Sequence, residues 1–83
     1  MKEIRLRPNV SAEIRAIDQP TALKILRTID AYARSGEGPV KALNGKFEGL
    51  LRLRVGNYRV LFDETPEAVT IHRIRDRRDA YRW

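Results

Sequence analysis

Three arginines lie close together in the segment LRLRVGNYRV, residues 51–60, and no acidic residue separates them. They are Arg52, Arg54 and Arg59. A guanidinium group is planar and permanently charged, and its fork of N–H donors fits phosphate and carboxylate groups. Cations held against a phosphate can also stabilise negative charge that develops on it during a reaction. The segment therefore indicates recognition of an anion, with phosphate chemistry as the more demanding possibility.

The same segment predicts a β-hairpin that places the arginines on one face. Gly56-Asn57 favours a two-residue loop, and with that loop position 54 lies opposite 59 and position 52 opposite 61. Side chains alternate between the two faces of a strand. The apolar face is expected to carry Leu51, Leu53, Val55, Tyr58, Val60 and Phe62. The other face is expected to carry Arg52, Arg54, Arg59 and Leu61.

The expected pairing of Arg54 with Arg59 needs an explanation, because like charges directly opposed in a sheet cost up to about 1 kcal/mol. A slip by one residue would expose the apolar set, so the register would hold the pair in place. Either both side chains extend into water or are neutralised by acids such as Glu48 or Asp63, or an anion binds between them. Arg52 and the arginine-rich C-terminal segment favour the anion.

Basic residues are unevenly distributed along the 83 residues, which hold 17 Lys and Arg against 11 Asp and Glu and carry a formal charge of +6. From residue 50 onward every basic residue is arginine: Arg52, Arg54, Arg59, Arg73, Arg75, Arg77, Arg78 and Arg82. This distribution favours a polyanionic partner over a merely solvated surface.

Composition also sets limits on the class of protein. There is no cysteine, which excludes disulfides and thiolate metal sites. No apolar run is long enough for a signal peptide or for the roughly 18 residues of a membrane span. We expect one domain over residues 1–83, located in the cytoplasm, without contact to a membrane.

Hydrophobic periodicity predicts an α+β domain. The N-terminal part is expected to hold a strand at 2–7, a helix at about 8–17 and a second helix from the N-cap Asp18 to Gly36. A glycine-rich loop at 36–49 follows, in which part of VKAL pairs briefly with the sheet. The C-terminal part is expected to hold strands at 50–55, 58–63 and 68–74 and a charged tail at 75–83. The order β-α-α-β-β-β predicts a two-helix hairpin on one face of a small, mostly antiparallel sheet.

The chain resembles the RelE/ParE toxin superfamily. The resemblance lies in LRLRVGNYRVLF, residues 51–62, in RDRRDAYR, residues 75–82, and in LNG, residues 43–45. It implies a RelE-like fold and a toxin of a type II toxin–antitoxin system. RelE-like members are ribosome-dependent endoribonucleases that cut mRNA, whereas ParE-like members poison DNA gyrase and generally lack the catalytic basic residues. The basic residues of this chain favour the RelE-like branch.

The resemblance implies roles for particular residues. The catalytic set would be Arg54, Arg59, Arg77 and Tyr81. The resemblance also places a basic residue at Arg52, and we expect RNA contacts from Arg52 and from the other arginines near the C-terminus, Arg73, Arg75, Arg78 and Arg82. The chain departs from RelE at Arg52 and Arg54, where RelE has lysines, and at Asp76, where many relatives carry histidine, lysine or glycine.

The implied reaction uses the RNA 2′-hydroxyl as nucleophile and requires no metal or other cofactor. His72, the one histidine of the chain, is either a general base or a half-buried structural residue. The implied partners are a cognate antitoxin, the ribosome and mRNA, with DNA reached only through the antitoxin complex. The alternatives are a ParE-like gyrase inhibitor and an inactive homologue that only binds antitoxin.

Overall fold

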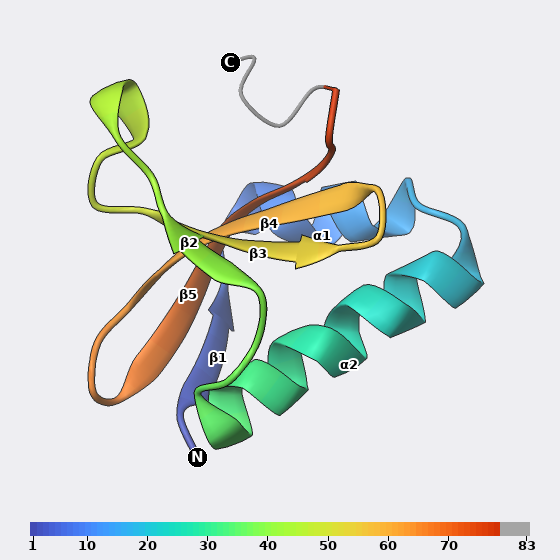
Figure 1. Ribbon diagram of the computed structural model, residues 1–83. Helices are drawn as coiled ribbons and strands as arrows, with labels where there is room; N and C mark the ends of the chain where they lie inside the picture. Colours follow the sequence, from blue (N-terminus) through green and yellow to red (C-terminus); the bar gives the residue numbers. More distant parts are fainter. Residues whose placement is uncertain (79–83) are drawn as a thin grey trace.

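A computed structural model describes residues 1–78 (Figure 1). Its elements are β1 (Glu3–Leu6), α1 (Pro8–Arg15), α2 (Gln19–Ser35), β2 (Val40–Ala42), the 3₁₀ turn η1 (Gly45–Phe47), β3 (Leu51–Val55), β4 (Tyr58–Glu64) and β5 (Ala68–Asp76). The strands form one sheet in the order β1-β5-β4-β3-β2. Only β1 and β5 pair in parallel, while the other neighbours are antiparallel. The expected α+β class and mostly antiparallel sheet are confirmed.

Local chemistry favours the start of both helices and the end of α2. Pro8 occupies the first turn of α1, where its missing N–H costs nothing. The Asp18 carboxylate caps α2 by accepting from the Thr21 backbone N–H at 3.1 Å. Gly36 ends α2 in the left-handed conformation with φ 74°, which glycine adopts without strain. The expected second helix is therefore confirmed, while α1 ends at Arg15, two residues earlier than 17.

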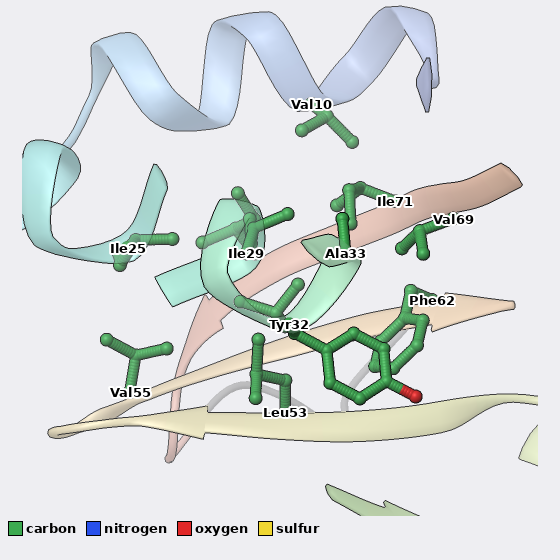
Figure 2. Close-up of a cluster of buried hydrophobic side chains, with 12 residues drawn as sticks. Val10, Ile25, Ile29, Tyr32, Ala33, Leu53, Val55, Phe62, Val69 and Ile71 are labelled. Atoms are coloured by element: carbon green, nitrogen blue, oxygen red, sulfur yellow. The ribbon is translucent and has the colours of Figure 1, made fainter. Parts of the chain in front are cut away.

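The core lies between the helices and one face of the sheet (Figure 2). Ile25 and Ile29 of α2 and Val10 of α1 are almost fully buried against the strands. The rings of Tyr32 and Phe62 meet edge-on, with centroids 5.3 Å apart. The predicted apolar face of the hairpin is confirmed: four residues are buried and Leu51 and Tyr58 pack against them partly exposed. The buried four are Leu53, Val55, Val60 and Phe62.

Helix α1 continues the protection of β5 where β1 stops. The β1 pairing ends at Leu6 with Ile71, so the backbone groups of β5 beyond that point would be open. Asn9 Nδ2 donates to the His72 carbonyl at 2.9 Å, and the Glu13 carboxylate accepts from the Ile74 N–H at 2.7 Å. Two side chains of α1 therefore take the place of a further strand at this edge.

The C-terminal strand is longer than the sequence predicted. Arg75 and Asp76 belong to β5, not to a charged tail, because they pair with Arg59 and Tyr58 of β4. The brief pairing expected within VKAL is confirmed as β2, which lies antiparallel to β3. Of the rest of the expected tail, Arg77 and Arg78 form a turn after β5, and residues 79–83 lie outside the described part of the chain. Among the described residues, no helix is long and apolar enough to cross a membrane.

Candidate functional site

A row of three arginines crosses the sheet on the face opposite the core. Arg54 of β3 lies directly opposite Arg59 of β4, as the hairpin pattern predicted. On its other side Arg59 lies opposite Arg75 of β5, a pairing that the sequence did not predict. Residues paired in this way project from the same face with Cβ atoms about 5 Å apart. We call Arg54, Arg59 and Arg75 the arginine row.

The hairpin loop fixes this row. It contains only Gly56 and Asn57, since Val55 pairs with Tyr58. Gly56 has φ 58°, whereas Asn57, like every other non-glycine residue of the described chain, does not have a positive φ. A positive φ at the first loop residue only is the pattern of a type II′ turn. Such turns match the twist of the flanking strands, and they keep Arg54 in register with Arg59.

A second row lies next to the first on the same face. Arg52 is opposite Leu61, and Leu61 is opposite Arg73. On the outer side Arg52 is opposite Lys41 of β2. Leu61 is fully buried although it lies on the face away from the core cluster. The face therefore carries basic side chains from four neighbouring strands around one apolar residue.

The members of the arginine row differ in their contacts. Arg54 is exposed, while the Arg59 guanidinium folds back on the hairpin and donates to the carbonyls of Tyr58 at 3.1 Å and Gly56 at 3.3 Å. Neither has a carboxylate partner within residues 1–78. Neutralisation of the pair by Asp63 does not occur, because Asp63 bonds to His72. The outer face of the hairpin thus keeps its positive charge.

Glu13 is the acidic residue that the sequence analysis missed. Its side chain is 8% exposed and lies 3.2 Å from Arg73 and 3.5 Å from Arg75. Two of the arginines expected to contact RNA are therefore already close to a carboxylate. The signal in the sequence was the polar pair Asn9 and Glu13, spaced i, i+4 on a helix, whose side chains also bond to each other at 2.9 Å.

His72 and Arg73 both lie on the arginine face because β5 contains a bulge. Phe62 pairs with Ile71 and Leu61 with Arg73, so His72 is the extra residue. Its imidazole is half-buried and bonds to the Asp63 carboxylate. The face of His72, which the sequence left open, is therefore that of Asp63, Leu61 and Arg73. Within residues 1–78, no three His, Asp or Glu side chains gather as metal ligands would.

The end of β5 brings further arginines near the hairpin loop. The backbone N–H of Arg77 donates to the Asn57 carbonyl at 2.7 Å, and the Arg77 side chain is exposed. Arg78 bonds to Asp76, and its backbone N–H holds the pKa of that carboxyl below its usual value. Tyr81 and Arg82 lie outside the described residues.

Comparison with known proteins decides the family. The sequence profile of the ParE toxins of type II toxin–antitoxin systems, parDE, matches residues 4–81, nearly the whole chain. The chain belongs to this ParE toxin family. A comparison with curated proteins gave no match. The predicted membership in the RelE/ParE toxin superfamily is thereby confirmed, and the chain is a type II toxin by family.

Solved structures of toxins share the fold of this ParE-family toxin. The RelBE2 toxin–antitoxin complex from Mycobacterium tuberculosis aligns with a TM-score of 0.81 and 17% identity, covering 90% of this chain and 96% of the other. A YafQ H87Q mutant from E. coli aligns with a TM-score of 0.79 and 9% identity, covering 98% and 99%. The YoeB–YefM complex from Staphylococcus aureus gives 0.73 and 14%, covering 90% and 95%.

Proposed function

We propose that this ParE-family toxin is an endoribonuclease that cleaves mRNA on the ribosome. The observation that carries the proposal is the arginine row, in which Arg54 and Arg59 remain without a carboxylate partner among the described residues. Such a pair costs stability unless an anion binds there, and an RNA phosphate supplies the anion. A nuclease needs cations beside a phosphate, and this opposed pair of arginines supplies them.

In the proposed reaction the RNA 2′-oxygen loses its proton and attacks the neighbouring phosphorus. The bond from phosphorus to the 5′-oxygen breaks, which yields a 2′,3′-cyclic phosphate, and the leaving 5′-oxygen takes up a proton. Arg59 binds the phosphate with Arg54 beside it, and both stabilise the charge that develops on its oxygens. Arg77, next to the hairpin loop, steadies the leaving oxygen. Tyr81 is proposed to stack on a base of the scissile dinucleotide.

The remaining basic residues are proposed to hold the RNA backbone. Contacts would come from Arg52, Arg73, Arg75, Arg78 and Arg82. The guanidinium group of arginine stays protonated and cannot accept a proton, so the general base must be another group. His72 is a candidate because it lies on the arginine face and its bond to Asp63 orients the ring. The reaction requires no metal ion or cofactor in this proposal.

Mapping of mRNA ends tests the nuclease proposal. Wild type, Arg59→Ala and Arg27→Ala are induced in bacteria, where Arg27 is an exposed residue on α2 and serves as a charge-matched control. Wild type and Arg27→Ala should produce new, codon-phased ends on translated messages, and Arg59→Ala should not. Growth arrest by wild type without such ends would show that the proposal is wrong. Purified toxin with and without ribosomes then shows whether cleavage depends on the ribosome.

The rival function is inhibition of DNA gyrase, and the observation that favours it is the match to the ParE profile itself. It would appear as gyrase-dependent DNA cleavage and loss of supercoiling, with intact mRNA. A toxin homologue without activity would fold normally and leave growth unchanged. Supercoiling of a reporter plasmid, followed in the same induced cultures, separates these outcomes.

We also propose a cognate antitoxin as partner, in the cytoplasm. Similar folds occur in complexes of toxin with antitoxin, including RelBE2 and YoeB–YefM. An amphipathic segment with acidic residues would suit both the basic face and the outer side of α2, where Leu23 and Leu26 are exposed. DNA would be reached only through that complex.

A further inference from the structure

A polar cavity of about 360 Å³ opens beside the second basic row. Its lining includes Arg7, Lys46, Phe47, Leu50, His72 and Arg73. The walls come from three parts of the chain: the residue before α1, the segment around η1, and the bulge of β5. The volume lies within the range of about 300–1,000 Å³ that is typical of small-ligand sites. The cavity shares His72 and Arg73 with the proposed RNA site, whereas no residue of the arginine row lines it.

The cavity combines cations with an aromatic ring. Arg7 is exposed and has no carboxylate partner within residues 1–78, and the Lys46 ammonium lies 5.2 Å from the centroid of the Phe47 ring. Arg7 also stands at the N-terminal end of α1, whose first turn contains no acidic residue. The positive end of the helix dipole therefore adds to the charge of Arg7. The cations Arg7 and Lys46 favour a phosphate, and the Phe47 ring offers a surface for a flat base.

We propose that this cavity binds the nucleotide next to the phosphate held by the arginine row. Arg73 belongs both to the cavity and to the row beside the arginine row, so one RNA strand can reach from one site to the other. Arg7 and Lys46 bind the phosphate of that nucleotide, and its base stacks on Phe47 and contacts Leu50. An aromatic side chain can stack on any of the bases. The shape of the cavity limits the size of the base that can enter it. The inference rests on the proposed RNA substrate and adds a second subsite to it.

Binding of short RNAs with 2′-O-methyl groups tests the subsite, because without a free 2′-hydroxyl they cannot be cleaved and binding is measured apart from the reaction. Three labelled RNAs are compared by fluorescence anisotropy: a dinucleotide, the same RNA extended by one nucleotide at either end, and the extended RNA with an abasic residue in the added position. Wild type should bind one extended RNA at least about fivefold more tightly than the dinucleotide, since stacking of one base is worth that much or more. The abasic RNA should lose most of this gain.

The variants locate the gain in the cavity. Arg7→Gln removes a charge, Phe47→Leu removes the ring while keeping an apolar residue, and Arg27→Gln on the outer face of α2 is the charge-matched control. Arg7→Gln and Phe47→Leu should abolish most of the gain, and Phe47→Leu should bind abasic and complete RNA equally well. Arg27→Gln should behave as wild type.

Three outcomes would overturn the subsite. In the first, wild type binds the extended RNA no more tightly than the dinucleotide. In the second, neither Arg7→Gln nor Phe47→Leu reduces the gain in affinity. In the third, adenosine monophosphate alone binds tightly, and this binding does not depend on Arg59. The last would indicate a site for a free nucleotide. The nuclease proposal fails separately, when mRNA ends stay unchanged although the binding gain is present.

Discussion

At the scale of single residues, the opposition of Arg54 and Arg59 is expected to lower the stability of the free protein and to favour binding of an anion. Both project from the same face, and no carboxylate of the described chain pairs with either. The apolar residues of the hairpin prevent a change of register that would separate them. Residues that lower the stability of the free protein while serving a ligand are common at functional sites, so a measurable cost is expected here.

Replacing Arg54 by threonine should relieve this repulsion. We expect Arg54→Thr to raise the free energy of unfolding by up to about 1 kcal/mol at low salt, since threonine suits a strand and carries no charge. The gain should shrink in about 1 M salt, which screens exposed charges. Urea unfolding at two salt concentrations measures both effects.

Arg54→Lys is the matched control, because it keeps the charge at the same position. It should leave stability near that of wild type. Equal stabilisation by both substitutions would mean that something other than charge is responsible, and no stabilisation by Arg54→Thr would show that the side chains already avoid each other in water.

At the scale of elements, α1 acts on β5 through Glu13. The Glu13 carboxylate accepts the Ile74 N–H and lies within 3.5 Å of both Arg73 and Arg75. One side chain thus joins a helix to a strand and balances charge on the basic face. Because the carboxylate is largely buried, removing its charge leaves two arginines less well compensated.

We expect Glu13→Gln to lower the free energy of unfolding by about 1–2 kcal/mol. This value is smaller than that for a fully buried ion pair, because the side chains of Arg73 and Arg75 are about one-third exposed. The same substitution should strengthen RNA binding, since the basic face gains net positive charge. Chemical unfolding and anisotropy measure the two effects. Glu48→Gln, at an exposed position, is the control and should change stability little. Loss of stability without any change in RNA affinity would separate Glu13 from the binding face.

The sequence predicted the strand pairing within the β3–β4 hairpin better than the pairing of β4 with β5. The hairpin register followed from one dipeptide and an alternating pattern, so the pairing of Arg54 with Arg59 was predictable. The position of Arg75 was not, because the loop before β5 does not fix its register and the bulge at His72 shifts it by one residue. The length of β5 was underestimated for a related reason: charged residues there suggested a solvated tail, whereas pairing with β4 keeps them in the sheet.

At the scale of the whole molecule, three distant elements meet at Glu64. Tyr32 of α2 and Lys2 beside β1 both donate to the Glu64 carboxylate at the end of β4. These bonds hold the pKa of Glu64 below its usual value, with Lys2 as the larger cause. Burial, aided by the bond to Glu64, raises the pKa of Tyr32 from 10.0 to about 12.

The raised pKa of Tyr32 predicts an alkaline loss of stability. The unfolded chain loses this proton near pH 10 and the folded chain near pH 12, so the contribution is complete below pH 10 and disappears as the pH rises to 12. We expect a loss of about 2 kcal/mol over this interval, measured by urea unfolding at several pH values. Tyr32→Phe should be less stable at neutral pH and should decline less steeply.

Tyr58→Phe is the control for this titration, because the Tyr58 hydroxyl makes no hydrogen bond to the part of the chain that the structure covers. It should keep the steep alkaline decline of wild type. An equal decline in Tyr32→Phe and wild type would assign the titration to other groups.

The pairing of β1 with β5 has a consequence for the order in which the protein is made. Synthesis proceeds from the N-terminus, so β1 is made first, and its partner β5 comes after every other strand. Until then β1 has no strand to pair with and β4 has an open edge, while Glu13 and Arg59 lack the arginines that they meet in the finished sheet. Contacts between such distant segments form slowly. A nascent chain therefore cannot display the complete basic face, and a message cut within the codons for β5 would yield a chain without it.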